Sequence, residues 1–227
     1  AGAEITSIED ASGGGKILKL KAGADIEVDL VIMATGIKTN LEWLEGSGVE
    51  VNGGVVINDH LRSSESNIYA AGDVAEGPER VGEGKAVHAT EPTAMQHGRV
   101  AGANMAGVDT AYEGSLLVNI VDVLDLEIAS FGNWDDEEAE VIQAVKKDRP
   151  AYRKLLFEGG RLVGAILLGR TRDIWATNDA GMLKGLIQSG CDLSEWKEHL
   201  RGNPFDIKRA YLAVGAAETL LPETLLG

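Results

Sequence analysis

Cysteine is almost absent from the sequence. The 227 residues contain a single one, Cys191, whereas an intrachain disulfide, a Cys-x-x-Cys redox pair or a cysteine zinc site needs at least two. The four histidines show no metal-ligand spacing, so we expect no metal site. Because disulfides belong to oxidising compartments, a chain of this kind suits a reducing, cytoplasmic setting.

Excess positive charge and long apolar runs are missing as well. The chain carries 36 acidic and 21 basic residues, a net charge of −15, which makes nucleic acids and anionic membranes poor partners. No apolar run approaches the roughly 20 residues that span a bilayer. The opening AGAEITSIED has neither the basic nor the apolar region of a signal peptide, and it lacks an initial Met. We therefore expect a fragment of a longer protein or a natural subunit.

The chain does have enough apolar residues for a folded protein. They make up 44% of the sequence, and the length can hold one large or two modest hydrophobic cores. Residues 3–9 and 16–22 alternate around a Ser-Gly-Gly-Gly turn, which predicts an antiparallel pair of strands. Residues 26–33 become continuously apolar, which predicts a strand covered on both faces and ending at Ala34-Thr35-Gly36.

A second group of short strands is expected after residue 48. Asn-Gly-Gly at 52–54 lies between β-branched residues, and Asn-Gly in that setting favours a hairpin turn because it tolerates positive φ. The apolar run 68–71 predicts a buried strand that stops at Gly72-Asp73. An Asp at a strand end repels phosphate but accepts charge-assisted hydrogen bonds from ribose or ribityl hydroxyl groups. A Gly beside it lets the backbone approach a ligand.

Residues 89–107 (ATEPTAMQHGRVAGANMAG) predict a helix. Pro92 suits the first turn, where its missing N–H costs nothing, and Gly107 lies where a C-terminal cap belongs. Small or apolar residues recur on one face of this helix, so we expect another element to lie close against that face: Ala94, Gly98, Ala101 and Met105.

The composition changes near residue 112, and a second domain of α+β type is expected from residue 113 onward. Strands are predicted over 116–131, 151–157 and 162–169, with a turn at 158–161. Helices are predicted over 177–189 and 193–200, the second opened by Asp192 or Ser194. The acidic run 132–140 is interpreted as the solvated start of a helix.

The motifs together resemble the FAD-dependent pyridine nucleotide–disulfide oxidoreductases. The segment VDLVIMATGIKTN (28–40) is similar to the return from the NAD domain to the FAD domain, and residues 51–74, which end in NIYAAGDV, are similar to the second FAD-binding segment. Residues 89–107 resemble the helix whose N-terminal end approaches the flavin. The remainder is similar to the C-terminal domain of NADH-dependent nitrite reductase large subunits and NADH:rubredoxin reductases.

The resemblance implies a fold and a set of site residues. The fold is a partial Rossmann-like FAD/NAD(P)-binding α/β domain, with the end of the NAD(P) domain at 1–37 and half of the FAD domain at 38–112, followed by an α+β C-terminal interface domain at 113–227. Asp73 would hold the flavin ribityl chain, with Gly72 and Val74 beside it. The other implied contacts to FAD are Ala34, Thr35, Gly36, Glu91, Pro92 and Thr93.

The family's Gly-x-Gly-x-x-Gly loops, which bind the pyrophosphates of FAD and NAD, are absent from these 227 residues. Two readings follow. The chain is the C-terminal portion of an enzyme that passes electrons from NAD(P)H through FAD to an acceptor, or it is a non-catalytic subunit or isolated domain that needs a partner chain carrying those loops. An electron-acceptor protein and homo-oligomerisation are compatible with both, and no side chain stands out as an acid–base catalyst.

Overall fold

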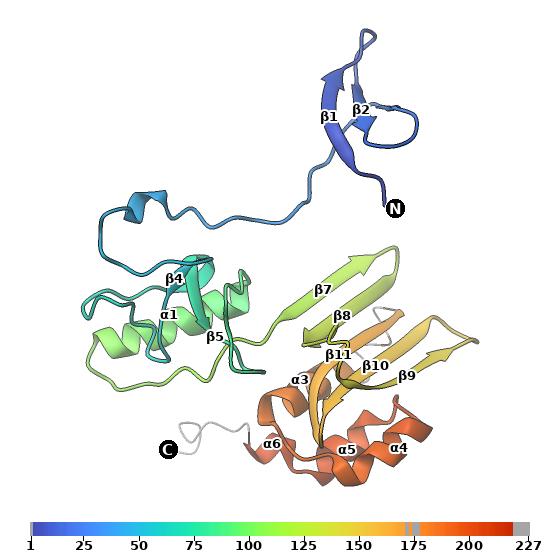
Figure 1. Ribbon diagram of the computed structural model, residues 1–227. Helices are drawn as coiled ribbons and strands as arrows, with labels where there is room; N and C mark the ends of the chain where they lie inside the picture. The colour runs from blue at the N-terminus through green and yellow to red at the C-terminus, as the bar shows by residue number, and fades with distance from the viewer. Residues whose placement is uncertain (1, 171–172, 174–177, 220–227) are drawn as a thin grey trace. The chain divides into compact units, whose positions relative to one another are not determined.

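The chain forms two compact bodies, residues 1–38 and 39–227, in a computed structural model (Figure 1). The structure describes residues 2–170, 173 and 178–219. Strands and helices are mixed along the sequence, and the strands form three separate sheets. None of the helices in the described part of the chain combines the length and the apolar character that a bilayer-spanning segment needs.

The first body is a three-stranded antiparallel sheet. Strands β1 (Ile5–Asp10) and β2 (Lys16–Leu20) form the pair expected around the glycine turn, and β3 (Ile26–Val28) joins the other edge of β2. The longer strand predicted over 26–33 was wrong, because regular structure ends at Val28. After Val28, none of the described strands of this body pairs with the chain, so the apolar side chains of residues 30–33 are not covered by a sheet.

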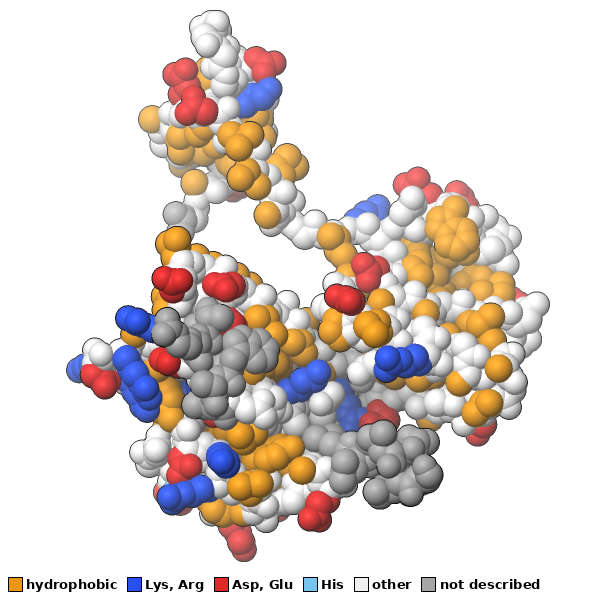
Figure 2. Space-filling model, turned by 180° about the vertical axis from the view of Figure 1, so that it is seen from behind, with side chains coloured by type: hydrophobic (Ala, Val, Ile, Leu, Met, Phe, Trp, Pro, Cys, Tyr) orange, Lys and Arg blue, Asp and Glu red, His pale blue; other side chains and the backbone are white. Residues whose placement is uncertain are grey.

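The apolar side chains after β3 are consequently exposed. Leu30, Ile32 and Met33 expose 73%, 81% and 75% of their surface. The strands of this body are also poorly buried, and Figure 2 shows apolar side chains on its surface. Contiguous exposed apolar surface of this kind marks a place where another polypeptide or a ligand belongs.

The first sheet of the second body is small and has three strands. Strand β4 (Val55–Val56) pairs in parallel with β5 (Ala75–Pro78), and β5 pairs antiparallel with β6 (Lys85–Ala86). A short 3-10 turn, η1 (Glu42–Leu44), precedes them. The hairpin expected at 52–54 is present in minimal form, as a bridge between Val51 and Val55.

The strand predicted over 68–71 was wrong. Within that run, Tyr69 makes a single bridge to Arg62, and the chain then enters a 3-10 turn, η2 (Gly72–Val74). The backbone at Gly72 has a φ of 76°, a left-handed conformation that interrupts an extended chain. The strand that pairs in the sheet is β5, which begins directly after η2. The apolar run therefore leads into the turn rather than forming the sheet.

The helix expected over 89–107 is confirmed as α1 (Glu91–Met105), with Pro92 in its first turn. The face predicted to be covered was right at Ala94, which lies against Gly72, and at buried Ala101, but wrong at its other two positions. The buried residues are Thr93, His97 and Ala101, whereas Gly98 lies in open space and Met105 is 68% exposed. Small residues occur on both sides of this helix, so composition did not identify the packed face.

The rest of the second body is a five-stranded antiparallel sheet in the order β7-β8-β11-β10-β9. The region predicted as strand over 116–131 is a hairpin, and the strands predicted over 151–157 and 162–169 are confirmed. The bounds are β7 (Val118–Val123), β8 (Leu126–Gly132), β9 (Glu140–Lys146), β10 (Ala151–Glu158) and β11 (Arg161–Arg170). The helix start predicted in 132–140 was wrong, because this acidic segment leads into edge strand β9.

Helices gather at one side of this sheet (Figure 1). Helix α3 (Asp179–Ser189) lies within the predicted helix 177–189, whose residue 177 is outside the described residues. The helix predicted over 193–200 is a 3-10 turn, η3 (Ser194–Trp196), that continues into α4 (Lys197–Gly202), and Asp192 accepts the Ser194 backbone N–H at 2.8 Å. Helices α5 (Ile207–Ala213) and α6 (Ala216–Thr219) were not predicted.

Candidate functional site

The turn η2 lies directly against the first turns of α1. Gly72 is buried, and a methyl group added to it would meet the Ala94 Cβ at 3.4 Å. Its φ of 76° is one that side chains other than glycine rarely adopt. The sequence therefore places glycine at the one point where the backbone of the turn approaches the helix, and Asp73 follows immediately.

Asp73 presents a free carboxylate beside this helix start. Its side chain is exposed, and among the described residues it forms no hydrogen bond or ion pair. A carboxylate held on a rigid turn with unused acceptor atoms suits the hydroxyl groups of a polyol. The residues present thus fit the ribityl chain of a flavin, which offers hydroxyl donors and no negative charge.

The N-terminus of α1 has no side-chain cap. Thr90 is the N-cap residue but gives no side-chain cap, and its hydroxyl bonds to the Thr93 hydroxyl at 3.1 Å instead. Pro92 has no N–H, so the first turn offers the backbone N–H groups of Glu91 and Thr93. Aligned peptide dipoles make this end of a 15-residue helix partially positive, which favours negative charge in front of it.

A buried histidine connects the turn to the helix. The Gly72 backbone N–H donates to the Nδ1 of His97 at 3.2 Å, and His97 is 1% exposed. Burial lowers the pKa of His97, and the charge of nearby His88 lowers it further. His97 was not among the predicted site residues. His97 lies four positions after Thr93, and this helical spacing placed both residues on one face of α1, which could have identified His97 from the sequence.

His88, in the loop before α1, is buried too. Its side chain is 5% exposed, and its Nε2 lies 3.4 Å from a Glu79 carboxylate oxygen. That distance allows an electrostatic contact, although neither ring nitrogen has a hydrogen-bond partner among the described residues. The His88 carbonyl accepts the Thr90 N–H at 2.8 Å, so this loop is tied to the helix start by its backbone.

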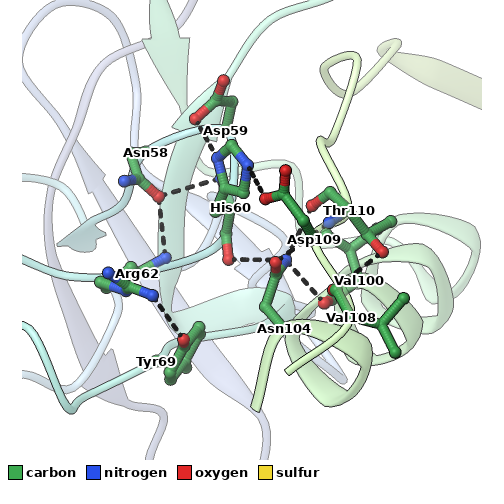
Figure 3. Close-up of polar contacts among 10 residues, drawn as sticks. All are labelled: Asn58, Asp59, His60, Arg62, Tyr69, Val100, Asn104, Val108, Asp109 and Thr110. Atoms are coloured by element: carbon green, nitrogen blue, oxygen red, sulfur yellow. Dashed lines mark hydrogen bonds and ion pairs between the residues drawn. The ribbon is translucent and has the colours of Figure 1, made fainter. Parts of the chain in front are cut away.

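The far end of α1 is fixed by Asn104 (Figure 3). Its side-chain N–H groups donate to the carbonyls of Thr110 at 2.7 Å, Val100 at 3.0 Å and His60 at 3.3 Å, and its Oδ1 accepts the Thr110 N–H at 3.1 Å. His60 also contacts the carboxylates of Asp59 and Asp109 at 2.7 and 3.0 Å. The hydrogen bond with Asp59 raises the pKa of His60.

The structure brings together two of the three segments expected around the cofactor. Gly72, Asp73 and Val74 form η2, and Glu91, Pro92 and Thr93 form the first turn of α1, directly before Ala94, which Gly72 approaches. Residues 34–36 are exposed and belong to the first body, so the site described here consists of the second body alone. Within the described residues, no three His, Cys, Asp or Glu side chains could hold a metal ion together.

Two family models match the sequence. Residues 1–98 match the model described as pyridine nucleotide-disulphide oxidoreductase, and residues 118–190 match the rubredoxin NAD+ reductase C-terminal domain. The first match ends inside α1 and includes η2, and the second covers the five-stranded sheet and α3.

Known proteins share both parts. The nitrite reductase [NAD(P)H] of Bacillus subtilis is 33% identical over 180 residues, 78% of this chain and 21% of that protein. The NADH-dependent phenylglyoxylate dehydrogenase subunit epsilon of Aromatoleum evansii is 29% identical, over 93% of this chain and 49% of that protein. A solved NAD-dependent persulfide reductase from A. fulgidus superposes with a TM-score of 0.72 at 26% identity, over 83% of this chain and 37% of that one. The chain thus spans half or less of each relative.

Proposed function

Because the chain belongs to the pyridine nucleotide-disulphide oxidoreductase family, we propose that it supplies half of an FAD site in an enzyme that passes electrons from NAD(P)H through FAD to an acceptor. The observation that carries this proposal is the free Asp73 carboxylate on the buried Gly72 turn, beside the uncapped N-terminus of α1. FAD, when bound, supplies the redox chemistry, and the protein supplies binding, orientation and electrostatics.

Asp73 is the proposed ribityl-binding residue. Its carboxylate would accept hydrogen bonds from the polyol hydroxyl groups, and bonds with one ionised partner are about twice as strong as neutral ones. Gly72 and Val74 would line the same contact with their backbone, and the missing Cβ of Gly72 lets the turn lie close to Ala94 on α1. The lack of any competing protein partner for Asp73 among the described residues supports this role.

Glu91, Pro92 and Thr93 are proposed to lie against the isoalloxazine ring. The free N–H groups and the positive dipole end of α1 would stabilise the negative charge of the reduced cofactor. Ala34, Thr35 and Gly36 are proposed to pass near FAD as well. Their small side chains and the φ of 97° at Gly36 suit a backbone that must run close to a ligand.

The pyrophosphate groups need a binding loop that these 227 residues do not contain. We propose that polypeptide outside the given sequence provides the Gly-x-Gly-x-x-Gly loops, in the same protein or in a partner chain. The second case corresponds to the alternative function, a non-catalytic subunit or isolated domain. We also propose a division into 1–37, 38–112 and 113–227, supported by separate clusters of buried hydrophobic residues before and after residue 113.

The physiological partners are proposals of the same kind. We propose an electron-acceptor protein and a homo-oligomer, in a reducing, cytoplasmic setting, since the chain carries one cysteine, which is partly exposed. The match of residues 118–190 to a reductase C-terminal domain supports a protein acceptor. The net charge of −15 argues against nucleic acid and anionic membranes as partners.

A visible absorption spectrum tests the function. The purified chain is incubated with FAD, separated from free flavin, and treated with NADH. A flavin band that NADH bleaches supports the complete electron-transfer function. A colourless chain that gains flavin only with a polypeptide carrying the glycine-rich loops supports the subunit alternative. Failure to gain flavin in either preparation contradicts the proposed cofactor site.

A further inference from the structure

The first residue of η2 creates a local requirement for a hydrogen-bond acceptor. The N–H groups at the start of a helical turn have no partner within that turn, and Gly72 is the first residue of η2 and is buried. An unpaired buried N–H is costly because it has lost its bond to water. The Nδ1 of His97, on α1, accepts this N–H at 3.2 Å.

We propose that His97 is a positioning residue of the flavin site: its ring holds the Gly72 turn against α1 and thereby fixes where the Asp73 carboxylate points. This inference rests on the proposed function and adds a residue that does not itself touch the cofactor. His97 is bonded to the turn through the Gly72 N–H, and it lies on the buried face of α1.

The bond to Gly72 sets the protonation state of the ring. A backbone N–H can only donate, so Nδ1 must be unprotonated, and a neutral imidazole then carries its proton on Nε2. Nε2 lies 3.5 Å from the hydroxyl of Ser115, which is 3.0 Å from the hydroxyl of Tyr112. The Ser115 oxygen can accept a hydrogen bond from the Nε2–H, so the neighbours of both ring nitrogens agree with one tautomer.

The ring is held on its other sides as well. The Tyr112 ring packs edge-on at 4.7 Å between centroids, at an interplanar angle of 88°, and Gly77 on β5 lies close to the ring edge. The titratable groups facing His97 are His88 and Tyr112, and Glu79 lies beyond His88. Burial lowers the pKa of His97, in keeping with the neutral tautomer that the Gly72 bond requires.

Three variants separate the hydrogen bond from the space that the ring fills. His97→Asn keeps a side-chain acceptor near the Nδ1 position, and His97→Leu keeps apolar volume but removes the acceptor. Arg99→Leu, on the exposed side of the same helix, is the matched control. We expect His97→Leu to speed hydrogen exchange of the Gly72 amide about tenfold or more, whereas His97→Asn and Arg99→Leu leave it near the wild-type rate.

The same order is expected for flavin affinity, measured with the polypeptide that supplies the pyrophosphate loops: His97→Leu weakens it about tenfold or more, and His97→Asn restores most of it. Wild-type flavin affinity in His97→Leu overturns the inference. If His97→Leu does not fold, the imidazole nitrogen spectrum of the wild-type chain decides, since a proton on Nδ1 overturns the inference and a proton on Nε2 supports it. A wild-type chain that never binds flavin contradicts the proposed function instead, while the Gly72 exchange rates still report on the turn.

Discussion

Asp73 is the residue on which the proposed cofactor site depends most directly. Replacing it with alanine removes an ionised acceptor, and hydrogen bonds to charged groups contribute about 1.5–3 kcal/mol. We therefore expect Asp73→Ala to weaken FAD binding about 10- to 100-fold, measured by flavin titration in the presence of the polypeptide that carries the glycine-rich loops. Asp122→Ala, an exposed carboxylate on β7, is the control. Equal affinities for the two variants would exclude Asp73 from the site.

His60 and His97 are expected to change the free energy of unfolding in opposite directions as pH rises. The pKa of His60 is raised in the folded chain, chiefly by its hydrogen bond with Asp59. Its contribution to stability is therefore complete below the unfolded pKa of about 6.5 and is lost as pH rises through the folded pKa. Burial lowers the pKa of His97, so its contribution is complete above about pH 6.5 and is lost as pH falls toward the folded pKa.

A comparison of wild type with His60→Gln by urea unfolding checks the His60 sign. The difference in unfolding free energy should be larger at about pH 5.5 than at about pH 8.5. His60 is bonded to two exposed carboxylates, Asp59 and Asp109, so added salt should reduce the difference. A difference that grows with rising pH would contradict the raised pKa.

The proposed roles of Gly72 and Asp73 rest on neighbouring residues in the chain, which the sequence shows, whereas the proposed role of His97 rests on a distant partner. Gly72 and Asp73 stand together in the sequence, and their chemistry follows from the two residue types. The role of His97 depends on a hydrogen bond across 25 positions, which no local pattern reveals. Exposure of residues 30–33 was missed for the same reason, because burial of an apolar run depends on which strands pair with it.

Among the secondary-structure elements, α1 was predicted well from the residues that start and end a helix. Pro92 and Gly107 mark its two ends through the fixed φ of proline and the positive φ of glycine, which is 85° at Gly107. The packed face was predicted only in part, right at Ala94 and Ala101 and wrong at Gly98 and Met105, because tertiary contacts select it. The apolar run before η2 was likewise assigned to a strand, since a positive φ at Gly72 is not visible in hydrophobic periodicity.

Two glycines on the exposed face of α1 are expected to weaken the helix, because no neighbouring atom requires a glycine there. Gly98 and Gly102 would each receive a Cβ with no atom within 4 Å, and glycine inside a helix costs about 0.5–1 kcal/mol relative to alanine. We expect Gly98→Ala and Gly102→Ala each to raise the free energy of unfolding by about that amount, measured by urea titration. Gly72→Ala should lower it, because of the positive φ and the Ala94 contact. A destabilising Gly98→Ala would mean that something packs against this face.

A buried ion pair joins β10 to α3. Arg153 and Asp179 are 2.5 Å apart, with side chains 6% and 9% exposed. Removing one partner leaves the other charge buried, so Asp179→Ala should lower the free energy of unfolding by about 3–5 kcal/mol. The double variant Arg153→Met/Asp179→Leu should recover most of that loss, because no charge is left unpaired. The exposed ion pair between Lys21 and Glu4 is the comparison: Lys21→Ala should change the free energy of unfolding by less than about 1 kcal/mol.

At the scale of the whole molecule, the sequence motifs predicted the family and the mixed α/β class, and both are confirmed. The order β7-β8-β11-β10-β9 was not predicted, because pairing of β8 with β11 joins residues 32 to 44 positions apart. One link inside the second body was also invisible in the sequence: Arg80 donates to the Gln188 carbonyl at the end of α3 and to the Glu113 carboxylate. It ties the loop after β5 to the five-stranded sheet and its helices.

The segment that holds Ala34–Gly36 is predicted to be sensitive to protease. Residues 30–41 have no regular secondary structure, and Lys38 within them is exposed. Trypsin needs a locally extended, accessible chain, so we expect early cleavage after Lys38, giving a product that begins at Thr39, identified by mass spectrometry. Lys38→Gln should abolish this product. If Ala34–Gly36 pass near FAD as proposed, cleavage should slow several-fold once flavin and the polypeptide with the glycine-rich loops are bound. Unchanged cleavage in a preparation that holds flavin would remove this segment from the proposed site and leave Asp73 and α1 as its described part.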